Sequence, residues 1–280
     1  MAFKRVGIVF NFRGDTAGTL AQALYTRLVK NWDCWIASTE TDEAIQREVS
    51  GTDVLVTVGG DGTILKTFRV VLPLSLPSLS VNTGRVGFMT EIDGSVAMSH
   101  VPRYLASNSL RVERRATITA EVLAGGDGKT RWAKFHALND IVVGRREVAR
   151  VAQVEAKIDG SLVTTYRADS VIVATATGST GYALACGGPI MFPESDELLL
   201  VPVSPHLSLG NPLLIRSEGV VELKLTSEYP GLASADGQMD IALERGDIVR
   251  VTKGQATALF LRDSEPAAFY ANLTQRLHMR

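Results

Sequence analysis

Cysteine is scarce in this sequence and long apolar runs are missing, and each absence excludes a class of protein. The 280 residues include two cysteines, Cys34 and Cys186, which form no CxxC pair, so neither a disulfide framework nor a zinc site is predicted. Pro73 and Pro77 interrupt the most apolar stretch, and no run approaches the roughly 18 residues of a membrane span. The apolar part of the first ten residues is too short for a signal peptide. We therefore expect a cytoplasmic protein.

An excess of charge of one sign is also missing. Lys and Arg number 29 and Asp and Glu number 30, which gives a net charge of −1 and no basic footprint for nucleic acid or for an acidic membrane. The four histidines show no HExxH or similar metal spacing, and Ser179 lies outside any GxSxG elbow. We expect no nucleic-acid or membrane partner, while a small anionic ligand needs only a local positive field.

The first part of the chain alternates strand and helix patterns. Short β-branched or apolar runs predict strands, and apolar residues at helical spacing predict the first helix. Residues 42–49 are predicted as a short polar helix, and a third helix is predicted to follow the glycines. Such alternation favours a Rossmann-like α/β domain, in which helices cover both faces of a parallel sheet. The predicted strands lie at residues 5–11, 35–39, 53–58 and 76–82, and the predicted helices at 16–30, 42–49 and 63–71.

The pattern changes after about residue 110 to short β-rich segments that turn signals separate. This part is predicted to be a β-sandwich-like domain, with one helical turn near 180–186. The last segment, 266–280, is predicted to be helical and to pack back onto the first domain. We therefore expect an α/β domain at 1–109, completed by 265–280, and a β-rich domain at 110–264. The predicted strands are 116–123, 132–143, 152–158, 170–176, 220–225 and 248–252.

Three glycines surround one carboxylate where the third predicted strand gives way to a helix, in Gly59-Gly60-Asp61-Gly62-Thr63. Glycine allows close approach of the backbone to a ligand, and the free amides at a helix N-terminus attract phosphate. A carboxylate beside phosphates gains nothing unless it handles a proton or meets a cation. We therefore interpret Asp61 as a general base or hydrogen-bond acceptor for an attacking hydroxyl.

The alternative for this turn is an Asp-Gly turn whose side chain caps the following helix. The glycine turn directly follows a strand that is predicted to be buried, and this position favours the interpretation of Asp61 as a base or hydrogen-bond acceptor over a simple helix cap. The GxxxxGK[ST] and GxGxxG patterns of the common nucleotide sites are both absent here.

A second constellation, VATATGSTGYALACGGP, occupies residues 173–189. Thr177, Ser179 and Thr180 surround Gly178, so small hydroxyls and bare backbone meet at a predicted strand-to-helix turn. Tyr182 adds an aromatic plane on which a base can stack. The alternative is a Ser/Thr-rich turn that caps a short helix, with Tyr182 in the core.

Together these motifs resemble a known family. The GGDGT turn is shared by NAD kinases and by diacylglycerol and sphingosine kinases, and phosphofructokinases have GGDG. The segment 177–189 is similar to the second signature of NAD kinases, commonly TGSTAYxxSxGGP. Three weaker matches follow the same order: NTGRVGF at 82–88, ALND at 137–140 and ADGQ at 235–238. The resemblance covers about residues 55–240.

The resemblance implies roles for individual residues. Asp61 would meet the 2′-hydroxyl of the adenosine ribose, while Arg167 and Asp169 match a segment that can reach the nicotinamide side of a neighbouring subunit. Gly181, Ala185 and Ser170 depart from the family pattern, and the lost hydroxyl at Ala185 would weaken binding by about 0.5–1.5 kcal/mol. The implied substrate-binding residues are Gly59, Gly60, Gly62, Thr63, Arg85, Phe88, Asn139, Asp140, Arg167, Asp169, Thr180, Tyr182, Ala185 and Asp236.

The resemblance also implies a reaction, in which the terminal phosphoryl group of ATP or polyphosphate passes to the 2′-hydroxyl of NAD and gives NADP. Mg²⁺ is expected to bridge the donor phosphates without a dedicated protein cage. A homodimer or homotetramer is implied as well. Two alternatives stay open: a lipid kinase that shares GGDGT, and a non-catalytic NAD-binding sensor in which Asp61 grips the ribose hydroxyls.

Overall fold

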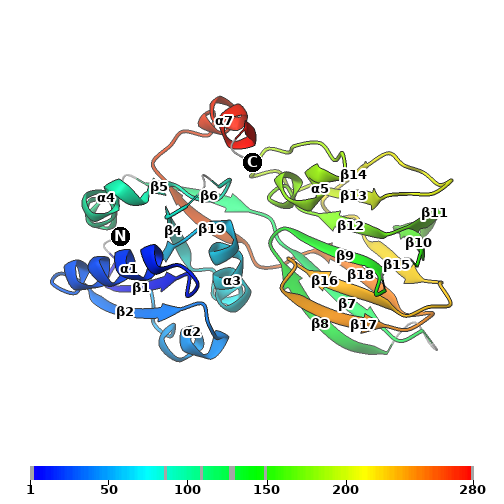
Figure 1. Ribbon diagram of the computed structural model, residues 1–280, viewed down its shortest axis with the longest axis horizontal. Helices are drawn as coiled ribbons and strands as arrows, with labels where there is room; N and C mark the ends of the chain where they lie inside the picture. Colours follow the sequence, from blue (N-terminus) through cyan, green and yellow to red (C-terminus); the bar gives the residue numbers. More distant parts are fainter. Residues whose placement is uncertain (1–2, 85–86, 108–109, 126–129, 148–149, 279–280) are drawn as a thin grey trace. The chain divides into compact units, whose positions relative to one another are not determined.

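The computed structural model describes residues 3–84, 87–107, 110–125, 130–147 and 150–278 of the chain (Figure 1). The chain forms two compact units. Unit 1 comprises Met1–Arg114 and Ala258–Arg280, and unit 2 comprises Arg115–Thr257. The chain therefore leaves unit 1, builds unit 2 without interruption, and returns.

Unit 1 is built on one sheet whose strand order is β2-β1-β3-β4-β19-β6. The pairs that β1 makes with β2 and β3, and that β4 makes with β3, β19 and β5, are parallel. β5 lies beside the end of β4, whereas β19 pairs with its start. The strands are β1 (Arg5–Phe10), β2 (Asp33–Ser38), β3 (Val54–Val58), β4 (Pro77–Asn82), β5 (Ile92–Asp93), β6 (Arg111–Arg115) and β19 (Ala258–Arg262).

Helices cover this sheet because its central strands are apolar on both sides; every residue of β3 is buried. Helix α1 (Asp15–Leu28) and helix α4 (Ala97–Ala106) share a core with β1, β3 and β4. Helix α2 (Asp42–Glu48) is joined to α3 (Asp61–Val71) by an ion pair between Asp42 and Arg69. The rings of Phe68 in α3 and Phe260 in β19 are 5.0 Å apart. The parallel α/β prediction is confirmed.

The remaining helical segments of unit 1 are short. The 3-10 turn η1 (Leu72–Leu74) follows α3, and η2 (Gly94–Val96) leads into α4. After β19 the chain ends in α6 (Ala268–Ala271) and α7 (Leu273–His278), which belong to unit 1. The predicted helix at 266–280 is thus two helices, and its return to the first unit is confirmed.

Unit 2 is a β-sandwich of two antiparallel sheets, as predicted. One sheet has the order β11-β10-β15-β18-β7-β8 and the other β14-β13-β12-β9-β16-β17. The first sheet comprises β7 (Ile118–Leu123), β8 (Arg131–Ala137), β10 (Ala152–Ile158), β11 (Ser161–Ala168), β15 (Val221–Leu225) and β18 (Ile248–Lys253). The second comprises β9 (Asp140–Arg145), β12 (Ser170–Ala174), β13 (Leu198–Val203), β14 (Leu213–Ile215), β16 (Gly231–Ala235) and β17 (Met239–Leu243).

The core of unit 2 lies between these two sheets and includes Val122, Tyr166, Val173 and Leu223. A second cluster packs on the outer side of β12 and β13 and includes Ala183 of the short helix α5 (Tyr182–Ala185), which follows the 3-10 turn η3 (Gly178–Thr180). The segment 132–143, predicted as one strand, is split between β8 and β9. Across the ranges that the structure describes, no helix is long and apolar enough to cross a membrane.

Candidate functional site

The glycine turn links β3 to α3, and Gly59 is required there by close packing. A Cβ at Gly59 would lie 2.1 Å from Thr63 Oγ1, so any side chain would displace the first turn of α3. By contrast, a Cβ at Gly60 or Gly62 would meet nothing within 4 Å. The backbone of these two residues is therefore uncovered at the N-terminus of an eleven-residue helix, where backbone amides and the helix dipole favour an anion.

Asp61 is the first residue of α3, and the backbone of a second segment holds its carboxylate. The Phe88 N–H donates to Oδ2 at 2.9 Å and the Met89 N–H donates to Oδ1 at 3.1 Å. A Cβ at Gly87 would lie 2.1 Å from Oδ1, so the carboxylate can approach this segment only because residue 87 is glycine. Each carboxylate oxygen accepts one of these hydrogen bonds and has a further lone pair that can accept another. Asp61 is half-buried, so a ligand can reach it.

The segment that holds Asp61 follows β4 and begins with a side-chain turn. The Asn82 side chain donates to the Gly84 carbonyl at 3.2 Å, and the Gly84 N–H donates back to Asn82 Oδ1 at 3.1 Å. Phe88, a predicted ligand residue, is buried in unit 1. Arg85, another predicted ligand residue, lies outside the described residues.

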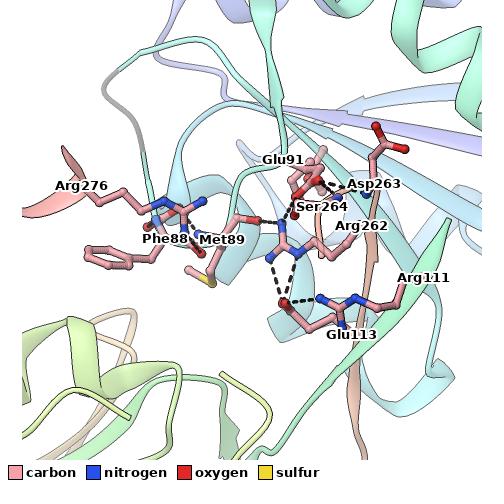
Figure 2. Close-up of polar contacts among 12 residues, drawn as sticks. Phe88, Met89, Glu91, Arg111, Glu113, Arg262, Asp263, Ser264 and Arg276 are labelled. Carbon is pink, nitrogen blue, oxygen red and sulfur yellow. Dashed lines mark hydrogen bonds and ion pairs between the residues drawn. The ribbon is translucent and has the colours of Figure 1, made fainter. Parts of the chain in front are cut away.

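An arginine that no motif marks supports the same segment from β19. Arg262 donates from Nη1 to the Met89 carbonyl at 2.9 Å and to Glu91 at 3.1 Å (Figure 2). Its Nε and Nη2 donate to Glu113 Oε1 at 3.1 and 3.0 Å. Only 4% of Arg262 is exposed, so two carboxylates balance this buried charge. No local pattern could indicate this role, because Arg262 lies 171 residues from Glu91 and 149 from Glu113.

Unit 1 contains a cavity of about 770 Å³ near the carboxyl ends of β4 and β5 and the start of α1. Asn82, Thr83 and Gly84 form part of its wall, so the segment that holds Asp61 also borders this cavity. The other lining residues are Asp15, Thr16, Thr19, Leu20, Ala23, Asp93, Gly94 and Ser95.

In unit 2, the turn between β16 and β17 joins the junction of β8 and β9. Asp236 at this turn accepts three backbone hydrogen bonds, from Leu138 at 2.9 Å, Asn139 at 2.7 Å and Asp140 at 3.1 Å. Asp236 has a φ of 51° and Gly237 a φ of 62°, a left-handed pair that turns the chain tightly. The predicted residues Asn139, Asp140 and Asp236 therefore lie together.

These residues line a cavity of about 410 Å³ with Tyr182 and Ser234. Asn139 Oδ1 is buried and has no hydrogen-bond partner within the part of the chain that the structure describes. Burial, and secondarily the charge of Asp236, raises the pKa of Asp140 to about 7. Burial also raises the pKa of Asp236, although the three hydrogen bonds that it accepts from backbone N–H groups act to lower it. The cavity thus offers an unpaired acceptor, an aromatic ring and a carboxyl group that titrates near neutral pH.

The loop after β12 approaches the same junction. A Cβ at Gly178 would lie 2.1 Å from the Asn139 carbonyl oxygen, and Thr175 donates from Oγ1 to the Leu138 carbonyl at 2.6 Å. Ser179 is fully buried; its hydroxyl donates to the Ala176 carbonyl at 2.6 Å and accepts from the Met191 N–H at 3.0 Å. Ser179 therefore has an internal structural role.

The other predicted residues of unit 2 lie at varied positions. Thr180 is buried and bonds the Thr177 carbonyl at 3.1 Å, whereas Ala185 is exposed on α5. Arg167 is exposed on β11. Asp169 pairs with Arg145 at 3.1 Å. None of these four lines the cavity at Asn139.

Uncovered backbone at a helix N-terminus can bind phosphate, and the carboxylate held beside it can accept the proton of a hydroxyl, which are the two parts that a kinase acting on a hydroxyl group needs. Comparison with known proteins names the family. Residues 30–109 match the ATP-NAD kinase N-terminal domain, and residues 138–262 match the ATP-NAD kinase C-terminal domain. The chain belongs to the NAD kinase family.

Individual relatives are similar in sequence over nearly the whole length of this chain. An NAD kinase from Dehalococcoides mccartyi is 37% identical, over 98% of this chain and 96% of the relative. One from Chloroflexus aurantiacus is 34% identical, over 98% of both chains. These matches support a catalytic NAD kinase, and they support neither a lipid kinase nor a non-catalytic sensor.

Solved structures show the same fold. The crystal structure of yeast NADH kinase complexed with NADH superposes with a TM-score of 0.85 at 23% identity, covering 99% of this chain and 88% of that one. An NAD kinase from Archaeoglobus fulgidus in complex with ATP gives a TM-score of 0.77 at 26% identity, covering 99% of both chains.

Proposed function

We propose that this enzyme transfers the terminal phosphoryl group of ATP, or of polyphosphate, to the 2′-hydroxyl of the adenosine ribose of NAD and forms NADP. The observation that carries the proposal is the Asp61 carboxylate, which two backbone amides hold beside uncovered glycine backbone. The relative from Archaeoglobus fulgidus was solved with ATP, which supports ATP as the donor.

Asp61 is assigned the proton chemistry. One hydrogen bond from a backbone N–H to each carboxylate oxygen fixes the orientation of the group. The remaining lone pairs can accept the hydrogen bond of the ribose hydroxyl. As the hydroxyl oxygen bonds to the terminal phosphorus and the bond to the donor's bridging oxygen breaks, the hydroxyl proton passes to Asp61. The transition state is loose, so orientation matters more than strong basicity.

The phosphates are assigned to the turn itself. Gly60 and Gly62 leave their backbone uncovered, and Gly59 and Thr63 fix its shape through their close contact. Backbone amides at a helix N-terminus bind phosphate oxygens without needing a basic side chain. The resemblance adds Arg85 as a further substrate-binding residue and Phe88 as a residue that lines the dinucleotide pocket.

The nucleoside is assigned to the cavity of unit 2. Asn139 Oδ1 can accept a hydrogen bond from an exocyclic amino group, and Asp140 and Asp236 supply carboxyl groups nearby. Tyr182, whose exposed fraction is 44%, offers a ring for stacking. The resemblance alone assigns substrate binding to four further residues of unit 2, Thr180, Ala185, Arg167 and Asp169.

Mg²⁺ is the proposed cofactor. Among the described residues, no group of three or more His, Cys, Asp or Glu side chains is placed to hold a metal ion. The donor set fits Mg²⁺ nonetheless, because this ion is commonly held by substrate phosphates and water with one or two carboxylates, and Asp61 is a carboxylate beside the proposed phosphate site. When bound, Mg²⁺ would neutralise charge on the donor phosphates. A cytoplasmic location and a homodimer or homotetramer remain predictions.

The test replaces Asp61 with Asn, which keeps the size of the side chain, removes the proton acceptor and exchanges one of the two oxygens that accept a backbone N–H for an NH2 group. We expect kcat for NADP formation from NAD, ATP and Mg²⁺ to fall by a factor of about 100 or more, since general base catalysis contributes roughly 10²–10⁴-fold. Binding of NAD, measured by calorimetry, should change little. Turnover close to that of the wild type would disprove the role assigned to Asp61.

A further inference from the structure

The peptide group between Phe88 and Met89 connects Asp61 to the last helix of the chain. Its N–H, on Met89, donates to Asp61 Oδ1 at 3.1 Å. Its carbonyl, on Phe88, accepts a hydrogen bond from Arg276 Nη1 at 3.3 Å. The N–H and C=O of a trans peptide point in opposite directions. One planar group therefore has a guanidinium on one side and the proposed catalytic carboxylate on the other.

Arg276 lies on α7, and its side chain covers the ring of Phe88 (Figure 2). The guanidinium carbon is 5.7 Å from the ring centroid, within the range of a cation–π interaction. Phe88 is 6% exposed, so the ring is a fixed support. The stack and the hydrogen bond together restrain both the backbone and the side chain of residue 88.

The surroundings of Arg276 contain charges of both signs. Burial lowers the pKa of Arg276 most strongly, and Arg262 on β19 lowers it further. Three carboxylates raise the pKa of Arg276 instead: Asp61 on α3, Glu91 after β4 and Glu113 on β6. Arg276 Nε is buried without a hydrogen-bond partner in the described ranges. The guanidinium is therefore held in a place where it loses solvation, and its contacts with Phe88 and the nearby carboxylates must offset that loss.

We propose that Arg276 is a positioning residue for the phosphoryl transfer: it holds and polarises the 88–89 peptide group, and that group holds Asp61. The proposal rests on the proposed function of Asp61. Hydrogen bonds in a chain strengthen one another, so a cation at the carbonyl makes the N–H at the other end a better donor to a carboxylate. Without Arg276 the carboxylate would lose part of its orientation, while the nucleoside cavity of unit 2 would be unchanged.

Three substitutions separate the charge from the hydrogen bond. Arg276→Lys keeps the charge, Arg276→Gln keeps a neutral donor, and Arg276→Met keeps only bulk. We expect kcat to fall about tenfold in R276M, the effect of losing one charge-assisted hydrogen bond, with the KM for NAD within about threefold of wild type. R276K should retain most of the activity, and R276Q should lie between R276K and R276M. Arg27→Met, at an exposed position in the last turn of α1, is the matched control.

A double-mutant cycle with Asp61→Asn supplies the decisive readout. If Arg276 acts through Asp61, R276M should cause no further loss of kcat in the D61N background. Equal losses in both backgrounds, or wild-type kcat in R276M or R276Q, would overturn the proposal. Should R276M not fold, as judged by its melting temperature, R276K and R276Q carry the same comparison. A strong effect of D61N with a normal R276M refutes only the positioning role, whereas normal turnover in D61N refutes the role of Asp61 itself.

Discussion

At the scale of the residue, Gly87 controls the geometry on which the proposed chemistry depends. It donates nothing to Asp61; it matters because its missing side chain lets the carboxylate reach the amides of Phe88 and Met89. The sequence presented Gly87 only as one letter of NTGRVGF. Its contact with a residue 26 positions earlier depends on how β3 and β4 lie side by side, which a motif does not describe.

A methyl group at residue 87 should therefore reduce catalysis. In Gly87→Ala the new Cβ would meet Asp61 Oδ1 at 2.1 Å, so the carboxylate must move. We expect kcat to fall by about tenfold or more, because misplacement of a catalytic group by about 1 Å can cost 10²-fold. The melting temperature should fall only slightly. Gly14→Ala, where the nearest atom is 3.7 Å away, is the control; a G87A variant as active as that control would contradict the argument.

Asp140 gives a prediction about pH and stability. Burial, together with Asp236, raises its pKa in the folded protein to about 7, whereas an unfolded aspartate titrates near 3.9. The folded state thus binds the Asp140 proton more tightly than the unfolded state does. The contribution of this proton to the free energy of unfolding is complete below about pH 4 and is lost as the pH rises through about 7. Each pKa unit corresponds to about 1.4 kcal/mol.

Replacing Asp140 with Asn should remove this dependence. Thermal unfolding between pH 4 and pH 8 should show a melting temperature that varies less steeply in D140N than in wild type, with the difference greatest between pH 4 and pH 7. Asp240→Asn, at an exposed position on β17, serves as the control. Parallel curves for D140N and wild type would show that this carboxyl group titrates normally.

At the scale of the element, β19 joins parts of unit 1 that are distant in sequence. Arg262 at its end reaches the Met89 carbonyl, Glu91 and Glu113, and the backbone N–H groups of Asp263 and Ser264 donate to Glu91 Oε1, both at 3.0 Å. The strand therefore supports the segment that holds Asp61 from the side opposite the glycine turn.

Removing Arg262 alone should destabilise unit 1. Arg262→Met leaves Glu91 and Glu113 without this cation, and breaking a buried ion pair from one side typically costs about 3–5 kcal/mol. We expect urea unfolding, followed by tryptophan fluorescence, to show a loss of this order. The double variant R262M/E91Q removes the Glu91 charge as well and should recover part of the stability, while Glu113 keeps its ion pair with Arg111 at 3.3 Å. A double variant less stable than R262M would argue against charge burial as the cause.

The elements that the sequence predicted were those with a strong local signal. Strands β1, β3 and β4 follow from apolar runs, because both faces of a parallel sheet are buried, and helix α1 follows from apolar residues at helical spacing. Strand β11 went unpredicted because it is an exposed edge strand with polar residues, and β13 carries Pro202. The run 132–143 was wrong as a single strand, since its apolar content hides the turn that Asp236 stabilises.

At the scale of the whole molecule, the proposed site residues differ in how far the sequence could identify them. The glycine turn and the Asn139, Asp140 and Asp236 group could be chosen by motif, because each lies where a strand ends. Arg262 and Arg276 could not, because they belong to a strand and a helix with no motif, and only the returning chain brings them to residues 88–91. Long-range supports of a site are invisible to local patterns.

The place of β19 between β4 and β6 has a consequence for biosynthesis. Unit 2 is one uninterrupted segment, so it can fold while the ribosome still holds the residues that follow it. Unit 1 cannot close its sheet until residues 258–262 have emerged. The half that is translated first is thus completed last, after the whole of unit 2 has been synthesised.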